Sequence, residues 1–243
     1  MSTVDTCPRP RRALGCRMRA LLALLLLATP LRAQEVDLEL VLLADASGSI
    51  TQEEIDFQRQ SYAAALTDPG VIRAITSSGR IAVTYVEWAE NQATVVDWTI
   101  LDGPEATKAF AAALLAPPRQ AEGHNAIGDA LLAGKQRIEE NGITGLRQVI
   151  DFSGDSTGNY SGAGIEEGRD IVVAAGIVIN GLPILDNPTD PLLQEYEARI
   201  IGGPGAFAVA AVGREDFLTA LRRKLIQEIA GNPVAPMTIA QAP

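Results

Sequence analysis

The chain has 243 residues, with 20 basic and 30 acidic side chains and a formal net charge of −10. This acidity argues against nucleic acid and anionic membranes as partners, because both carry negative charge themselves. Both cysteines, Cys7 and Cys16, lie close to the amino terminus. A chain cleaved after them has no disulfide, no cysteine-ligated zinc and no cysteine nucleophile.

The first 33 residues predict a secretory signal peptide. Several arginines precede an apolar run from Ala20 to Ala28, which is too short to span a membrane, and we expect cleavage near Ala33. Met18 is an alternative start. Cleavage removes six arginines and one aspartate, which lowers the net charge from −10 to −15. No later segment could span a membrane, so we expect a periplasmic or secreted protein without membrane insertion.

Residues 34–231 alternate β-rich apolar runs with amphipathic helical patterns, and residues 232–243, with three prolines, predict a flexible tail. We expect strands at about Val36–Ala44, Arg80–Trp88, Ala93–Ile100, Leu146–Ser153, Ile177–Leu182 and Ala206–Val212. A first helix begins at the capping-box residues Thr51 and Glu54 and is stopped by Asp68-Pro69-Gly70. Further helices are expected at about Glu105–Leu115, Ile127–Glu140, Ile165–Ala175, Leu192–Ile201 and around the apolar stripe Phe217–Ile229.

Strands that alternate with helices predict an α/β fold with a doubly wound, mostly parallel six-stranded sheet and helices on both faces. Right-handed crossovers favour the strand order 3-2-1-4-5-6, with strand 3 antiparallel because a short turn joins it to strand 2. In such sheets ligands bind at the carboxyl ends of the strands where the winding reverses. That point lies between strands 1 and 4.

Oxygen-bearing side chains follow both of these strands. Asp45, Ser47 and Ser49 come directly after strand 1, and Asp155 follows strand 4. A third loop, Gly123-His124-Asn125-Ala126-Ile127-Gly128, precedes a helix and can reach the same edge. Carboxylate and hydroxyl oxygens are ligands that Mg²⁺ prefers. Alternatively, Asp45 to Ser49 serve only to start the following helix.

The Asp-x-Ser-x-Ser motif at residues 45–49, the third loop and Gly154-Asp155 together resemble a von Willebrand factor type A (vWA) domain. They match its metal-ion-dependent adhesion site (MIDAS), and the resemblance covers about Val36 to Gly231. More narrowly, segments such as Val149–Asp155 and Gly176–Ile184 are similar to a set of exported bacterial proteins of this fold without an assigned function.

The resemblance implies a protein-binding, adhesion-type module rather than an enzyme. Asp45, Ser47, Ser49 and Asp155 would hold Mg²⁺ or Mn²⁺, and an acidic residue of a protein partner would complete the coordination. Asn125 stands where the family usually has threonine, so its role as a ligand is open. Without metal the two carboxylates would repel by roughly 3 kcal/mol, at ~5 Å and an effective dielectric of about 20.

Two other functions remain open. The departure at Asn125 is compatible with a vWA scaffold that has lost metal binding. Gly154-Asp155-Ser156 also resembles the nucleophile block of lipase-like esterases, with Ser156 as the nucleophile. A serine nucleophile needs a base, however, and His124, the one histidine of the chain, lies upstream of Ser156 whereas that family's histidine lies far downstream. We expect His124 to be solvated and Asp151, inside strand 4, to have a basic or hydrogen-bonding partner.

Overall fold

The computed structural model describes residues 34–231. The predicted signal peptide (residues 1–33) and tail (residues 232–243) lie outside the described residues. The strands are β1 (Gln34–Asp45), β2 (Ile81–Trp88), β3 (Gln92–Leu101), β4 (Ile143–Gly154), β5 (Val178–Leu185) and β6 (Ala211–Val212). The helices are α2 (Gln52–Leu66), α3 (Pro69–Ser77), α4 (Pro104–Leu114), α5 (Ile127–Glu139), α6 (Ile165–Ala174), α7 (Leu192–Arg199) and α8 (Gly213–Ala230).

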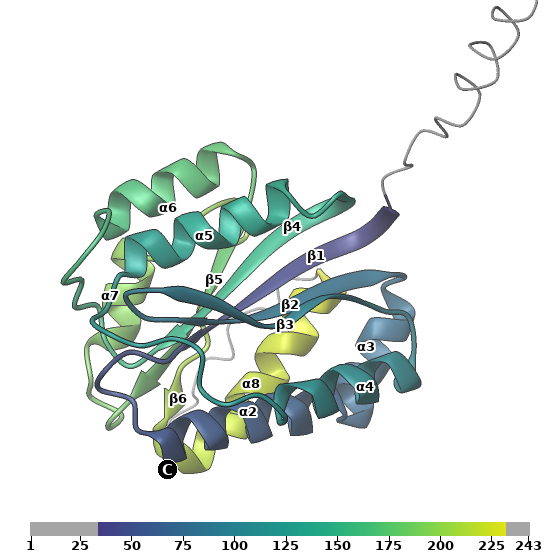
Figure 1. The fold of residues 1–243 in the computed structure, drawn as a ribbon, viewed down its shortest axis with the longest axis horizontal. Helices are drawn as coiled ribbons and strands as arrows, with labels where there is room; N and C mark the ends of the chain where they lie inside the picture. The colour runs from purple at the N-terminus through teal and green to yellow at the C-terminus, as the bar shows by residue number, and fades with distance from the viewer. Residues whose placement is uncertain (1–33, 232–243) are drawn as a thin grey trace, which may run out of the picture. The chain divides into compact units, whose positions relative to one another are not determined.

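The six strands form one sheet in the order β3-β2-β1-β4-β5-β6, in which β3 is antiparallel to β2 and the other pairings are parallel (Figure 1). The predicted fold class and strand order are therefore confirmed. β1 lies between β2 and β4, so its carboxyl end is the point where the winding reverses. Because the crossovers from β1 and β4 leave in opposite directions, a crevice forms there for ligands.

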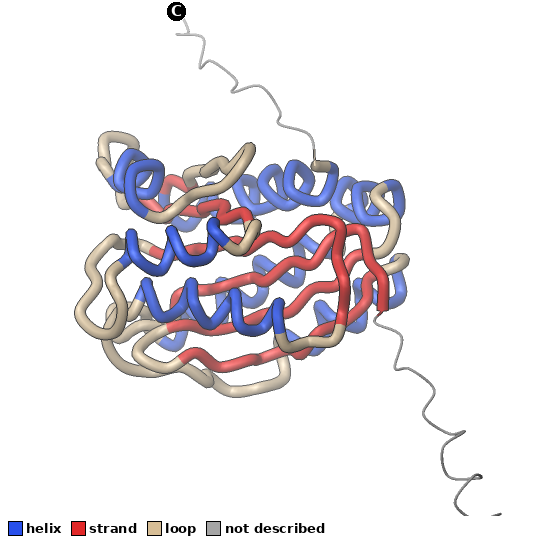
Figure 2. The backbone as a smooth tube through the Cα atoms, turned by 90° about the horizontal axis from the view of Figure 1, so that it is seen from above, coloured by secondary structure: helices blue, strands red, loops and turns tan. Residues whose placement is uncertain are grey.

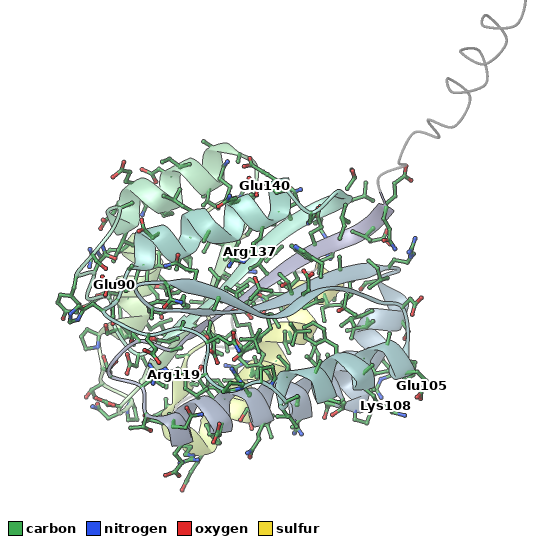
Figure 3. All side chains as sticks on the ribbon, viewed as in Figure 1. Glu90, Glu105, Lys108, Arg119, Arg137 and Glu140 are labelled. Carbon is green, nitrogen blue, oxygen red and sulfur yellow. The ribbon has the colours of Figure 1, made fainter. Side chains whose placement is uncertain are left out.

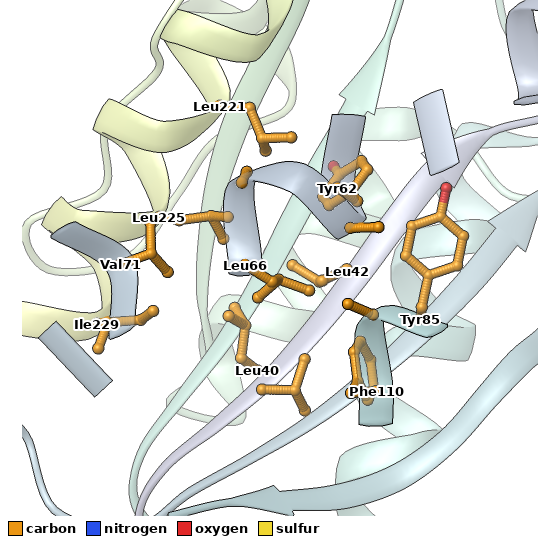
Figure 4. Packing of buried hydrophobic residues seen from close by; sticks show 14 of the residues in the cluster. Leu40, Leu42, Tyr62, Leu66, Val71, Tyr85, Phe110, Leu221, Leu225 and Ile229 are labelled. Carbon is orange, nitrogen blue, oxygen red and sulfur yellow. The ribbon is translucent and has the colours of Figure 1, made fainter. Parts of the chain in front are cut away.

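Helices cover both faces of the sheet, as Figure 2 shows from above. One face packs against α2, α3, α4 and α8 through Leu40 and Leu42 of β1, which contact Tyr62, Leu66 and Leu225 (Figure 4). The other face packs against α5, α6 and α7 through the alternate residues of β1, Val41 and Leu43. Consecutive residues of β1 point to opposite faces, and both faces are covered, which explains its unbroken apolar run.

Two sequence predictions about elements were wrong. Asp68-Pro69-Gly70 does end α2, but it also begins α3: the Asp68 side chain accepts a hydrogen bond from Gly70 N at 2.7 Å, and Pro69 occupies the first turn. The last strand is shorter than expected, because only Ala211 and Val212 pair regularly with β5. Earlier in that run, Ala208 makes only an isolated bridge to Gly181.

Candidate metal centre

Asp45 is the last residue of β1, and its carboxylate is buried at the edge of the sheet. Its Oδ1 accepts a hydrogen bond from Ser47 N at 2.8 Å, so the chain turns back on the carboxylate immediately after the strand. Its Oδ2 has no hydrogen-bond partner. A buried carboxylate oxygen without a donor is costly, so this atom is available to a cation or a water.

Gly154 ends β4 next to Asp45. A Cβ atom at Gly154 would lie 2.9 Å from Asp45 Oδ2 and 3.1 Å from the Tyr196 hydroxyl, too close for any larger residue. The glycine therefore lets the Asp45 carboxylate lie against the backbone that leads into Asp155. Asp155 Oδ1 also has no hydrogen-bond partner. The structure thus brings the two predicted carboxylates together from separate crossovers.

The pKa values of these two carboxylates are shifted in the direction expected when no positive charge lies near them. Burial raises the pKa of Asp45 to about 7, the hydrogen bond from Ser47 opposes this, and the nearby charge of Asp155 raises it further. Burial also raises the pKa of Asp155, and the charges of Glu54 and Asp186 add to that shift. Among residues 34–231, none of the ion pairs includes Asp45 or Asp155.

The two predicted serines lie side by side in the loop after β1. Ser47 Oγ and Ser49 Oγ are 3.2 Å apart, with Ser47 fully buried and Ser49 exposed to solvent. Between them, Gly48 N donates to Gly123 O at 2.8 Å. This bond ties the first predicted loop to the third, which was expected to reach the same edge.

Asn125 lies in that third loop and is 7% exposed. Its amide nitrogen donates to Ser156 Oγ at 3.1 Å, so its amide oxygen is the atom that could face a cation. Its main-chain oxygen accepts from Tyr160 N at 2.8 Å. Asn125 therefore joins the third loop to the loop after β4. His124 is exposed, as expected for a solvated residue.

One residue that the sequence prediction missed is Arg119. Its side chain is labelled in Figure 3. Its guanidinium donates to the main-chain oxygens of Ser47 and Ile50, both at 2.9 Å, and to that of Ala46. Its Nε donates to Ala121 O at 2.8 Å. One side chain thus connects the loop that carries the two predicted serines to the chain leading into the third loop. In the sequence, Arg119 follows two prolines, and nothing there distinguishes it from a solvated arginine.

A buried ion pair anchors the Arg119 segment in turn. Arg59 Nη2 of α2 and Glu87 Oε1 of β2 are 2.6 Å apart, and both side chains are almost fully buried. Arg59 also donates to Pro118 O at 3.0 Å, and Glu87 accepts from Gln120 N at 2.7 Å. These bonds hold the residues on both sides of Arg119, so its guanidinium is positioned before any ligand arrives.

The contacts of Ser156 do not support the esterase alternative. Ser156 Oγ accepts hydrogen bonds from the Asn125 amide and from Gly158 N, both at 3.1 Å. Neither donor can act as a base, and a serine nucleophile requires one within hydrogen-bond reach. Within residues 34–231, the hydrogen bonds of Ser156 therefore stabilise the loop that follows β4.

The donor set consists of two carboxylates, two hydroxyls and one amide. No group of three or more histidine, cysteine, aspartate or glutamate side chains in the described part of the chain could hold a metal. That is expected for a site made mostly of neutral oxygens. Hard oxygen ligands in this mixture suit Mg²⁺ or Mn²⁺, with water or a partner filling the remaining positions. The residues present therefore fit a divalent cation.

Comparison with known proteins identifies the family of the chain. Residues 35–233 match the family described as "protein of unknown function (DUF1194)". The chain belongs to this family. No curated protein matches this DUF1194 chain by sequence. No helix within residues 34–231 is both long and apolar enough to cross a membrane.

Solved structures similar to this DUF1194 chain include a matrix protein, a pilus adhesin and a vWA protein. Proximal thread matrix protein 1 from the mussel byssus, with a zinc-occupied MIDAS motif, has a TM-score of 0.57 at 15% identity, over 81% of this chain and 49% of that one. The pilus adhesin SpaC from Lactobacillus rhamnosus GG has a TM-score of 0.56 at 13% identity, over 79% and 30%. A von Willebrand factor type A protein from Catenulispora acidiphila has a TM-score of 0.54 at 14% identity, over 80% and 42%.

The DUF1194 chain spans less than half the length of each of these three structures. At such identities the likeness shows a shared fold, and the fold is that of a vWA domain.

Proposed function

We propose that the protein is an exported module that binds a protein partner through a divalent cation, Mg²⁺ or Mn²⁺. Asp45, Ser47, Ser49 and Asp155 would hold the ion, with Asn125 beside them. The observation that carries this proposal is that the buried Asp45 and the partly buried Asp155 lie close together, each with an unpartnered oxygen, and form no ion pair with a basic residue. A divalent cation supplies the two positive charges that this edge of the sheet lacks.

The partner is proposed to contribute an acidic residue. Two carboxylates only balance the charge of the ion, so at a free coordination position the ion would still act as a Lewis acid toward an anionic oxygen of the partner. The exposed Ser49 lies on the open side of the site, where such a residue can approach. The adhesin and matrix proteins among the similar structures support a role in protein interactions. No catalytic step is proposed.

The first experiment is calorimetric titration of the purified protein with Mg²⁺ and Mn²⁺, beside Asp45→Asn and Asp151→Asn. Both aspartates are buried in neighbouring strands, but Asp151 contacts Lys224 rather than the metal edge. We expect binding by the wild type and Asp151→Asn and none by Asp45→Asn. A cation at a hundred times its Kd should stabilise the fold by about 2.7 kcal/mol. A wild type that binds neither ion would leave the metal-free scaffold as the function.

The second experiment tests the partner. Immobilised protein is incubated with an envelope extract of the exporting cell, first with Mg²⁺ and then with EDTA. We expect a retained protein that EDTA releases and that Asp45→Asn never retains. The partner's acidic residues are then replaced one at a time. If none of them matters, the partner does not supply the ligand.

The alternative of a metal-free scaffold has one specific observation in its favour. Asn125 already uses its amide nitrogen to hold Ser156, so the loop is closed without a cation. In that function, Asn125 makes a hydrogen bond to Ser156 at the position where a metal-binding vWA domain would have a metal ligand. The metal titration separates the two functions directly.

A further inference from the structure

The amino-terminal half of β4 has a sheet neighbour on one side only. β1 pairs with β4 from Ile143 onward, whereas pairing with β5 begins at Val149, opposite Val178. Among the described strands, none pairs with residues 143–148 on their β5 side. Successive residues of a strand turn their N–H and C=O to opposite sides, so every second residue of this stretch faces an open edge. Such edges readily pair with a further extended segment.

A cavity of about 340 Å³ lies at this open edge. It is lined by residues 145–149 of β4 together with the apolar side chains of Val178, Pro204 and Phe207. Leu146, on the same stretch of β4, is 84% exposed. An extended segment that fills the cavity can therefore gain main-chain hydrogen bonds and apolar contacts at the same time.

The chain itself leaves the described fold at this cavity. Gly231, the last described residue, lines the cavity and ends α8 in the left-handed conformation, with a φ of 66°. Arg147 of β4 holds this end of the helix, because its guanidinium donates to Glu228 O at 2.9 Å and to Ile229 O at 2.8 Å. Residues 232–243 therefore begin beside β4, at the Arg147 end of its open stretch.

The length of the following segment is sufficient to cover the edge. Residues 143–148 span about 20 Å at ~3.4 Å per residue. The twelve residues after Gly231 reach about 40 Å when fully extended. From the Arg147 end, the edge leads only toward Ile143, so a segment that follows it runs antiparallel to β4. β3 is likewise antiparallel to β2 on the other side of the sheet.

The composition of residues 232–243 suits an edge position. The segment has no charged residue and carries the apolar side chains of Val234, Met237 and Ile239. Its prolines are the reason why the sequence pattern predicts a flexible tail. An edge strand tolerates proline, however, because the position of the missing N–H can face solvent.

We propose that residues 232–243 add to the open edge of β4 as an antiparallel strand that fills the cavity and covers Leu146. Main-chain hydrogen bonds to residues 143–148 would hold this strand. Gly145 N would not take part, because it already donates to the carboxylate of Glu39 at 2.6 Å.

The attachment of the segment favours it over a free peptide. Because it is joined to the cavity wall at Gly231, its effective concentration at the edge is of the order of millimolar or higher. The site is also independent of the proposed metal centre, since Arg147 and Asp155 are about 25 Å apart along β4, at ~3.3 Å per residue.

The first test is disulfide trapping in a chain whose native cysteines are replaced (Cys7→Ser, Cys16→Ser). Leu146→Cys is combined in turn with cysteine substitutions in the segment: Val234→Cys, Met237→Cys and Ile239→Cys. After mild oxidation, mass spectrometry measures the rate of intramolecular disulfide formation. We expect at least one of the three pairs to form its disulfide at least about tenfold faster than the same segment cysteine does with Leu115→Cys.

Leu115→Cys is the matched control. Leu115 is also an exposed leucine, at 53%, but it follows α4, which packs against β3 on the other side of the sheet. Disulfide formation at this position measures how often a freely moving segment would meet an exposed cysteine. Equal rates at Leu146 and Leu115 would overturn the proposal and leave a flexible tail. Disulfides formed only between two molecules would also overturn it, because the edge would then belong to a second copy of the chain.

The second test is hydrogen exchange, which needs no cysteine. In the double variant Met237→Asp and Ile239→Asp, amides of residues 143–148 should exchange at least about tenfold faster than in the wild type, because two charges would enter the apolar cavity. The double variant Met237→Leu and Ile239→Leu should keep the wild-type rates. Exchange at residues 143–148 that is the same in all three chains would contradict the proposal. The result does not depend on whether the protein binds Mg²⁺.

Discussion

Beside the last turns of α8, and again at the carboxyl edge of the sheet, the protein places two acids close together, but it treats their charge differently. Asp151 and Glu228 share Lys224, whose ammonium contacts both at 2.5 Å. Asp45 and Asp155 form no ion pair with any described residue. The first pair carries a cation of its own, and the second needs one from outside.

The difference shows why burial of an acid alone does not identify a metal site. Burial raises the pKa of both Asp45 and Glu228, so the pKa values look alike. What separates them is the neighbourhood: a lysine and an asparagine around Glu228, two serines and a second unpaired acid around Asp45. The two pairs of acids should therefore respond differently to substitution, metal and pH.

The largest effect is expected when the internal cation is removed. Lys224→Met leaves Asp151 and Glu228 buried without a positive charge, and should destabilise the fold by about 3–5 kcal/mol. Urea denaturation in EDTA measures the loss. Asp45→Asn under the same conditions should cost little or should stabilise, because it relieves repulsion from Asp155 while keeping the bond from Ser47 N. Equal losses in both variants would mean that the two acid pairs do not differ.

The next effect concerns the loop that presents the serines. Arg119→Lys cannot reproduce the fork of hydrogen bonds to Ala46, Ser47 and Ile50, and should weaken Mg²⁺ binding by about 10–100-fold. Arg147→Lys is the matched control, since Arg147 likewise donates to two main-chain oxygens but lies at the other edge of the sheet. Calorimetric titration of both variants decides between them. Equal affinities would show that Arg119 does not position the ligands.

A third effect follows from pH. Asp45 must be ionised to hold a cation, and its pKa is raised to about 7. Mg²⁺ affinity should therefore rise with pH by up to about tenfold per unit below pH 7 and level off above it. In EDTA the sign reverses: the native state holds a proton that the unfolded chain has lost, so stability should fall as pH rises through about 7. Titrations and denaturation curves at several pH values test both trends, and parallel trends would contradict them.

The smallest effect is expected at Asn125. Asn125→Thr restores the hydroxyl that the vWA family usually has there, with a shorter reach, and should change Mg²⁺ affinity by less than about tenfold. The direction is informative: an increase would mean that the asparagine weakens the site. Ser156→Ala is the control, because it removes the hydrogen bond to Asn125 without adding a ligand. Calorimetric titration with Mg²⁺ measures both affinities.

Much of the fold could be predicted because its signals are local. The apolar runs of β1 and β4, the capping box at Thr51 and Glu54, and the alternation of strands and helices led to the correct sheet order. α3 was missed for an equally local reason: Asp68-Pro69 ends one helix and starts another, and the same residues favour both. The strand expected at Ala206–Val212 was too long, because its pairing depends on where β5 runs.

Strand order and chain direction are enough to show that Asp45, Ser47, Ser49 and Asp155 follow strands whose carboxyl ends meet, and both could be predicted from the amino-acid pattern. Which acids have a cation beside them became visible only in the folded chain. Lys224 lies in a helix that is distant in sequence from Asp151. Arg119 contacts the serine loop through main-chain oxygens, which every residue type has, so the sequence gives no sign of this contact. Charge balance inside a protein depends on distances of a few ångströms between remote segments, and packing alone sets those distances.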